Sequence, residues 1–237
     1  MERINKYLSA IGICSRREAD RMVDAGRIKV NGEIASLGTK VCDTDEIVID
    51  GKLITKQKNN TKDILLAFNK PVGIVCTTTN NQGTNTVVNY INYKERIYPI
   101  GRLDKDSCGL ILMTNNGEIT DKILRSANLH EKEYIVKVNK SIDDEFLKKM
   151  RSGIYLEELD RTTNKCEVTK IDDKTFRIIL TQGLNRQIRR MCKACNRNVV
   201  SLKRVRILNI LLGDLKTGEY REIKGAEKEA LYKILNS

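Results

Sequence analysis

Residues 100–110 read IGRLDKDSCGL and connect a polar loop to the start of an apolar run. The apolar residues at 109–113, followed by a turn at Asn116-Gly117, predict a buried strand directly after this loop. Arg102 and Asp104 thus lie two positions apart where the chain enters the core. A carboxylate held beside cations and away from water stays ionised and can act as a nucleophile or a base. A turn with a surface ion pair would explain the segment equally well by itself.

Short apolar runs bounded by turn residues recur on both sides of this strand and predict a sheet. Strands are expected at 64–68, 109–113, 134–138, 166–171, 176–180 and 205–211, with a hairpin at Asp173-Lys174. Helices are expected at 118–126, 142–150 (after Ser141 as N-cap), 186–195 and 226–235. The spacing is too irregular for repeated βαβ units. We therefore expect an α+β fold whose central sheet is mixed, largely antiparallel and flanked by helices.

The first 55 residues have a different pattern, which predicts a small module of two helices and a hairpin. Apolar residues at helical spacing mark a helix over 3–11, and Ser15 to Glu18 reads S-x-x-E, a capping box that opens a second helix ending at Gly26. Asn31-Gly32 favours a type I′ hairpin turn.

The polar, aperiodic stretch that follows this module predicts a linker over 56–63. The expected domains are therefore an N-terminal module over 1–55 and a larger domain over 64–237.

The chain is strongly basic, which predicts a polyanionic partner such as nucleic acid. It has 43 Lys and Arg against 31 Asp and Glu, and the forty residues from Lys174 to Gly213 hold ten basic residues and no acidic one. No run approaches the roughly 18 apolar residues of a membrane helix, and the polar N-terminus is unlike a signal peptide. We expect a cytoplasmic protein whose seven scattered cysteines are reduced thiols.

Four segments, in order, resemble the motifs of bacterial ribosomal-RNA pseudouridine synthases of the RsuA family. They are Asn69-Lys70-Pro71-x-Gly73, Gly101-Arg102-Leu103-Asp104, Lys132-Glu133-Tyr134 and Leu180-x-x-Gly183-x-x-Arg186-Gln187-Ile188-Arg189-Arg190-Met191. The resemblance covers residues 64 to about 223, and the first fifty-odd residues resemble the S-four-type RNA-binding domain that precedes the catalytic domain in that family. Within the family, the run QGLNRQIRRMC looks closest to a synthase of the large ribosomal subunit.

The resemblance implies an isomerisation of uridine to pseudouridine in 23S ribosomal RNA, and it implies a role for each matching residue. Asp104 would act at the ribose C1′ while the glycosidic bond breaks, and Tyr134 would pack on the target base. Arg189 would pair with the catalytic carboxylate. Arg102 would fill the gap left by the flipped nucleotide. Leu180 would line the base pocket, which Lys70 would support.

Basic residues in two regions are expected to bind RNA. In the larger domain these are Arg186, Arg190, Lys193, Lys203, Arg204 and Arg206, and in the N-terminal module Arg3, Arg16, Arg17, Arg27 and Lys29. Two of them, Arg16 and Arg17, stand in the first turn of a helix, where the helix dipole disfavours cations. The two arginines therefore do not stabilise the helix at these positions, and their presence favours a role in phosphate binding.

The expected reaction needs no cofactor and no metal, because it involves neither a redox step nor hydrolysis. The base must leave the helical stack, detach at N1, turn and reattach through C5. Cys192-x-x-Cys195 has metal-ligand spacing, but a zinc site needs two more ligands and the single histidine, His130, stands alone. We interpret both cysteines as helix residues, and we expect a structural role for His130.

Two other functions remain compatible with the basic patches: a non-catalytic assembly factor that binds ribosomal RNA, and a DNA-binding regulator. The set of Asp104, Tyr134 and Arg189 favours the enzyme, since binding alone has no need of a buried carboxylate facing a polyanion. We expect a monomer that acts on large-subunit ribosomal RNA. The sequence leaves open whether transfer RNA is a second substrate, and whether Asp104 is a nucleophile or a base.

Overall fold

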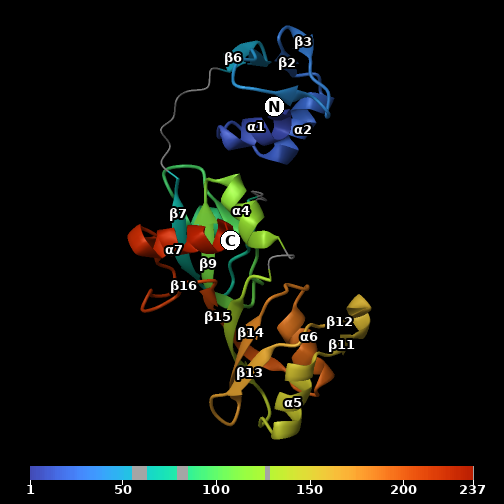
Figure 1. Cartoon of the computed structure of the whole chain (residues 1–237), viewed down its shortest axis with the longest axis vertical. Coiled ribbons are helices and arrows are strands. Elements are labelled where there is room, and N and C mark those ends of the chain that lie inside the picture. The colour runs from blue at the N-terminus through green and yellow to red at the C-terminus, as the bar shows by residue number, and fades with distance from the viewer. Residues whose placement is uncertain (55–62, 79–84, 126–128, 237) are drawn as a thin grey trace. The chain divides into compact units, whose positions relative to one another are not determined.

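A computed structural model of the chain describes residues 1–54, 63–78, 85–125 and 129–236 (Figure 1). The chain divides into two compact units, one of residues 1–63 with 115–117 and one of residues 64–114 with 118–237. All of the predicted linker except residue 63, and residue 126 of an expected helix, lie outside the described residues. Each unit has an apolar core of its own.

The N-terminal unit contains the predicted helix pair and hairpin. Helix α1 (Ile4–Ala10) is followed by α2 (Arg16–Asp24), where the Ser15 hydroxyl accepts a hydrogen bond of 3.1 Å from the Glu18 N–H, as the capping box predicts. Between β2 (Ile28–Val30) and β3 (Glu33–Ile34), Asn31 and Gly32 both have the positive φ that a type I′ turn requires.

Four further short strands complete this unit: β1 (Glu2–Arg3), β4 (Lys40–Val41), β5 (Ile47–Ile49) and β6 (Lys52–Ile54). Strand β1 pairs with β4, and the others form a sheet in the order β3-β2-β5-β6. The inward faces of both helices pack on this sheet through buried side chains such as Leu8, Ala19 and Ile28. The unit therefore buries a core despite its small size.

The larger unit is built on a nine-stranded sheet. Its strands are β7 (Leu65–Lys70), β8 (Tyr98–Ile100), β9 (Cys108–Thr114), β10 (Lys132–Val138), β13 (Glu167–Lys170), β14 (Thr175–Leu180), β15 (Val199–Ile207), β16 (Ile210–Leu211) and β17 (Tyr220–Glu222). The order is β13-β14-β10-β15-β9-β7-β17, with β16 beside β15 and β8 beside β9. Only β15 and β9 pair in parallel among the described strands of this sheet. The predicted α+β fold with a mixed, largely antiparallel sheet is confirmed.

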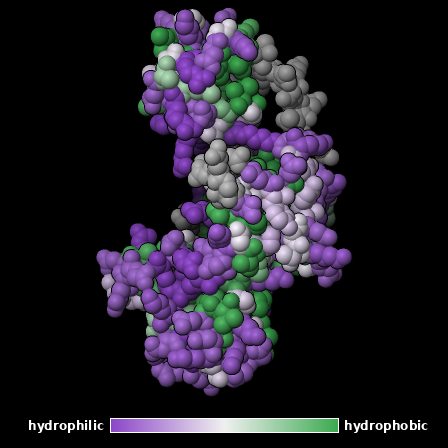
Figure 2. Space-filling model, turned by 180° about the vertical axis from the view of Figure 1, so that it is seen from behind, coloured by the Kyte–Doolittle hydropathy of each residue, from purple (hydrophilic) through white to green (hydrophobic). Residues whose placement is uncertain are grey.

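Helices cover both faces of the sheet, so its central strands are buried on both sides. Helices α3 (Val87–Ile91), α5 (Asp144–Ser152) and α6 (Gln187–Ala194) contribute to one apolar cluster, and α4 (Gly117–Leu124) and α7 (Gly225–Asn236) to another. Side chains of β7 alternate between them, Leu66 and Phe68 in the first and Leu65 and Ala67 in the second. A strand buried on both faces has no polar alternation, which explains its continuous apolar sequence. Figure 2 shows hydrophilic residues over most of the visible face, with hydrophobic residues in narrower patches.

A small excursion follows α5 and completes the described elements of this unit. Strands β11 (Tyr155–Leu156) and β12 (Arg161–Thr162) pair with each other across the short 3₁₀ helix η2 (Glu157–Leu159). The predicted hairpin at Asp173-Lys174 is also present, between β13 and β14.

Two predicted boundaries were wrong. The expected strand over 205–211 is two strands, because β15 begins at Val199 and the chain turns at Leu208, whose φ is 51°. The N-cap of α5 is Asp143 instead of Ser141, since the Asp143 carboxylate accepts the Phe146 N–H at 2.7 Å. The Ser141 hydroxyl instead donates to Asp173 at 2.9 Å.

Gly109 allows β9 and β15 to approach each other closely. Its φ is 102°, and a Cβ at this position would lie 2.3 Å from the carbonyl oxygen of Arg204. Such a contact is impossible without moving the backbone, so a side chain would separate the two parallel strands. Among the described residues, no helix combines the length and apolar character needed to cross a membrane.

Candidate active site

A cavity of about 510 Å³ lies in the larger unit where the loop before β9 meets the sheet and α6. Its walls bring together residues from segments far apart in the sequence: Asp104, Lys132, Tyr134, Leu180, Arg186 and Arg204. The volume lies within the range of small-molecule and cofactor pockets. The lining combines apolar surface with a cluster of charged groups near the rim.

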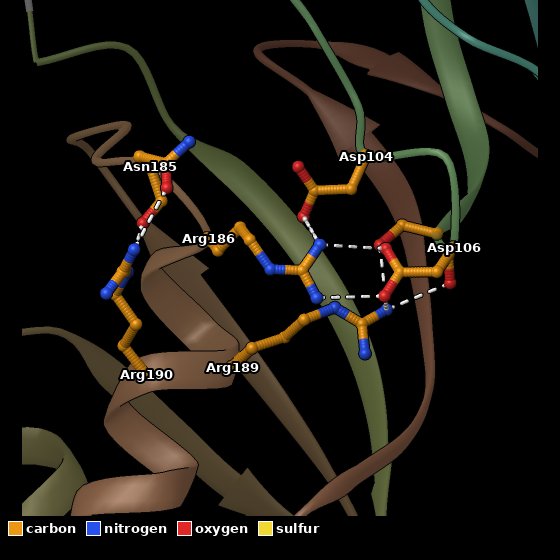
Figure 3. A network of polar contacts seen from close by, with 7 residues as sticks. Asp104, Asp106, Asn185, Arg186, Arg189 and Arg190 are labelled. Carbon is orange, nitrogen blue, oxygen red and sulfur yellow. Dashed lines mark hydrogen bonds and ion pairs between the residues drawn. The ribbon is translucent and has the colours of Figure 1, made fainter.

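Arg186 connects two carboxylates of the loop before β9 (Figure 3). Its Nη1 lies 3.6 Å from Asp104 Oδ2, and its Nη1 and Nη2 donate to the two oxygens of Asp106 at 3.1 and 2.9 Å. This two-bond contact fixes the plane of the guanidinium. The hydrogen bond from Arg186 is the main reason that the pKa of Asp106 lies below its usual value, and the same bond raises the pKa of Arg186.

Arg189 contacts Asp106 and Ser107, so the expected pairing of Arg189 with Asp104 is not present. Its Nη2 donates to the Asp106 carbonyl at 2.9 Å and to Ser107 Oγ at 3.0 Å, and lies 3.4 Å from Asp106 Oδ2. The partner of Asp104 is Arg186, one turn earlier at the N-cap of α6. Arg186 has a φ of 50°, and this left-handed conformation places its side chain across the loop (Figure 3).

Tyr134 and Leu180 lie on the same face of the sheet and form a wall of the cavity. Lys132 pairs with Leu180 across β10 and β14, and Tyr134 is two residues further along β10, so all three share one face. Leu180 is buried and Tyr134 half-buried. The structure therefore brings Asp104, Tyr134 and Leu180 to one pocket, as the sequence predicts.

Arg204 is the partner of Tyr134 across β10 and β15 and is buried in this wall, which contradicts its expected role in binding phosphate. Only 4% of the residue is exposed, its Nε donates to the Leu110 carbonyl at 2.6 Å, and its Nη1 donates to the Arg102 carbonyl at 3.3 Å. Its guanidinium carbon lies 6.0 Å from the centre of the Tyr134 ring. Arg204 thus holds the loop that carries Asp104 against β9 and β15. The side chain of Arg102 is exposed at the rim of the cavity.

Lys70 is fully buried, so it can support the pocket, as the resemblance implies, but cannot contact RNA directly. Its Nζ donates to the carbonyls of Pro71 and Ile74, each at 2.8 Å, and burial lowers its pKa. A lysine in this position organises the turn after β7 and cannot reach a ligand in the cavity.

Other predicted phosphate-binding residues of this unit already have partners. Arg190 forms an ion pair with Glu158 and donates to Asn185, and Arg206 lies between Glu131 and Glu133 at 3.0 and 2.9 Å. Lys193 lies 3.5 Å from Glu158 but remains largely exposed, as does Lys203. Phosphate contacts by Arg190 or Arg206 would require these ion pairs to open.

The predicted basic residues of the N-terminal unit are on its surface. Arg3, Arg16, Arg17, Arg27 and Lys29 are all exposed, and Arg27 donates to Asp50 at 2.8 Å. Their exposure is compatible with binding to a polyanion.

The sequence analysis assigned no role to Asp106 or to Lys132, although both belong to the site. The signal for Asp106 is its place in the run DKDS, two residues after Asp104.

His130 is buried, with Nδ1 3.1 Å from the Ile123 carbonyl. All seven cysteines are free, and burial raises the pKa of Cys192 to about 12. Within the described ranges, no group of three or more potential metal ligands occurs.

A mixed sheet and a pocket with a carboxylate, a tyrosine and an arginine agree with what the resemblance to RNA-modifying enzymes implies. The chain belongs to the RNA pseudouridylate synthase family, whose model matches residues 64–194, and an S4 domain model matches residues 2–47. It is thus an enzyme that isomerises uridine to pseudouridine in RNA. The predicted resemblance to the RsuA family, and within it to a synthase of the large ribosomal subunit, is confirmed.

Similar proteins include the dual-specificity RNA pseudouridine synthases RluF of Salmonella typhi and Escherichia coli K12. The first is 47% identical over 98% of this chain and 79% of its own length, and the second 46% identical over 99% and 80%. The ribosomal large subunit pseudouridine synthase B of Bacillus subtilis is 34% identical over 98% of this chain and 96% of its own length. A crystal structure of a pseudouridylate synthase has a TM-score of 0.71 and 27% identity, covering 98% of this chain and all of that one.

Proposed function

We propose that this synthase modifies a uridine of large-subunit (23S) ribosomal RNA and that Asp104 is its catalytic carboxylate. The observation that supports this role is the position of Asp104 on the wall of the cavity, 3.6 Å from the Arg186 guanidinium and on the same pocket as Tyr134 and Leu180. A carboxylate beside a cation can remain ionised where it meets the ribose. The name of the Bacillus subtilis relative, a ribosomal large subunit pseudouridine synthase, supports ribosomal RNA as the substrate class.

The pocket residues can divide the work of isomerisation between them. The target nucleotide leaves the stack and its base enters the space between Tyr134 and Leu180, which offer an aromatic and an aliphatic surface. Asp104 then acts on the ribose while the bond between C1′ and N1 breaks. Arg102, exposed at the rim, is in place to occupy the gap in the RNA. We expect the enzyme to act as a monomer.

RNA is bound in addition by the exposed arginines of the N-terminal unit and by Lys193 and Lys203 of the larger one. Contacts of this kind position the RNA through its phosphates and do not read its sequence. The proposed ribosomal substrate supports the expectation that the enzyme works in the cytoplasm.

Release of tritium from C5-labelled uridine tests the proposed substrate. The new bond forms at C5, so the hydrogen on C5 must leave to water, and large-subunit RNA should release label with protein and RNA alone. Transfer RNA and small-subunit RNA, labelled in the same way, are the comparison substrates. If large-subunit RNA keeps its label as free RNA, as precursor and in assembled subunits, the proposed substrate is wrong. Tight binding without release from any RNA would instead favour an assembly factor.

A further inference from the structure

Two cations stand at the inner wall of the cavity without an acidic partner. Lys132 lines the cavity and donates from Nζ to the His130 carbonyl at 3.0 Å. Arg204 lines the same cavity, and its Nη2 has no hydrogen-bond partner. In the described part of the chain, neither residue forms an ion pair with a carboxylate.

This arrangement is unfavourable in the empty protein. Burial and, next, the charge of Arg204 lower the pKa of Lys132, which means that the environment disfavours its charged form. Other cations of this unit do have acidic partners, because Arg186, Arg190 and Arg206 each form an ion pair with a carboxylate. A buried cation without a carboxylate partner is expected at a site where the ligand itself brings a negative charge.

The isomerisation creates such a charge inside the pocket. When the bond between C1′ and N1 breaks, its electron pair remains on N1, and the base becomes a uracil anion whose charge spreads to its carbonyl oxygens. The bond between C5 and C1′ then forms, C5 loses its proton to water, and N1 takes up a proton, so that the product has the composition of the substrate. Between these steps the anion lies in the pocket, where a fixed cation has a larger effect than in bulk water.

We infer that Lys132 is a catalytic residue that stabilises the detached uracil anion. It shares a face of the sheet with Tyr134 and is paired with Leu180, so it borders the same space as the two surfaces that hold the base. Arg204, whose guanidinium carbon lies 6.0 Å from the centre of the Tyr134 ring, adds to the positive potential of the cavity. This inference rests on the proposed function of the pocket.

Replacing Lys132 by methionine tests the inference, since methionine keeps an unbranched side chain and removes the charge. In single-turnover tritium release, Lys132→Met should be slower by about 10² to 10³, the usual effect of losing one group that stabilises developing charge. Lys132→Arg should stay within about tenfold of the native rate. The matched control is Lys137→Met, an exposed position on the same strand, which should leave the rate unchanged. RNA affinity, measured by filter binding, should be the same for all four proteins.

RNA that contains 5-fluorouridine separates this role from a structural one. Fluorine withdraws electrons and stabilises the uracil anion by itself, so the charge of Lys132 matters less for this substrate. The factor by which Lys132→Met slows the loss of N-linked 5-fluorouridine should therefore be at least tenfold smaller than the factor by which it slows the reaction of uridine. Mass spectrometry of RNA digests follows the loss of N-linked 5-fluorouridine. Equal slowing on both substrates, a native rate for Lys132→Met, or an inactive Lys132→Arg that folds normally would overturn the inference. None of these results contradicts the proposed function. The proposed function fails only if the native chain itself releases no tritium.

Discussion

At the scale of single residues, the site depends on which carboxylate each arginine meets. Arg186 gives its two strongest contacts to Asp106 and only a longer one to Asp104. Arg189 supports the same loop through a backbone carbonyl and the Ser107 hydroxyl. Asp106 therefore positions the guanidinium, while Asp104 keeps one side open toward the cavity.

Replacing Asp104 by asparagine should abolish isomerisation while the protein still folds and binds RNA. The substitution removes the charge and keeps the shape, and the proposed chemistry depends on the carboxylate. Single-turnover tritium release should fall by a factor of about 10³ or more. Turnover within tenfold of the native enzyme would show that another group performs the reaction.

Replacing Asp106 by asparagine should loosen Arg186 and slow the reaction about fivefold, since an ion pair with this much solvent exposure contributes at most about 1 kcal/mol. A double-mutant cycle with Arg186→Met measures whether Asp106 acts through this arginine. If it does, the double variant is no slower than Arg186→Met alone. Losses that multiply would show that the two residues act independently.

Sequence reasoning identified the residue types of the site better than their pairings. Asp104, Tyr134 and Leu180 belong to separate motifs, and the structure places all three on one cavity. Arg186 and Arg189 are one helical turn apart, so spacing alone does not decide which of them reaches Asp104. The sequence also does not predict the burial of Lys70 and Arg204, because their partners are backbone carbonyls that come within reach only in the folded chain.

At the scale of elements, the helix α5 shows how two neighbouring polar residues compete for one cap. Ser141 and Asp143 both precede the apolar face of the helix, and both residue types are good N-caps. The Ser141 hydroxyl is used by Asp173, which comes from the distant hairpin between β13 and β14. Local sequence predicts the helix itself, but it does not predict a contact between residues this far apart in the chain.

Asp143→Ala should lower the melting temperature more than Ser141→Ala does. The Phe146 N–H and, after it, Arg197 lower the pKa of Asp143 in the folded protein. A lowered folded pKa adds stability above the unfolded value, near 3.9, and this stability is lost as the pH falls through the folded value. The difference in melting temperature between Asp143→Ala and the native protein should thus be constant from pH 6 to 8 and shrink below about pH 4. Equal effects of both substitutions would contradict the assignment of the cap.

At the scale of the whole molecule, RNA binding is expected to draw on both units. The double variant Arg16→Ala, Arg17→Ala should weaken binding and flatten its dependence on salt, each lost phosphate contact lowering the slope by about 0.7 to 0.9. The pair Lys148→Ala, Lys149→Ala on α5 also removes two adjacent cations from a helix and should leave the slope unchanged. Filter binding over a series of salt concentrations gives both slopes. A native slope for the arginine variant would place the RNA surface of the N-terminal unit elsewhere.

The central place of β15 in the sheet has a consequence for how the enzyme is made. Among the described strands, β15 alone joins β10 and its neighbours on one side to β9 and its neighbours on the other. It extends to Ile207, so the ribosome has translated the other strands from β7 to β14 before this strand emerges. Until then Tyr134 and the loop of Asp104 belong to two separate pieces of sheet, and pairing them must bridge a long stretch of chain. A nascent chain is therefore inactive until β15 has been synthesised, and the pocket is assembled only when this strand pairs with both neighbours.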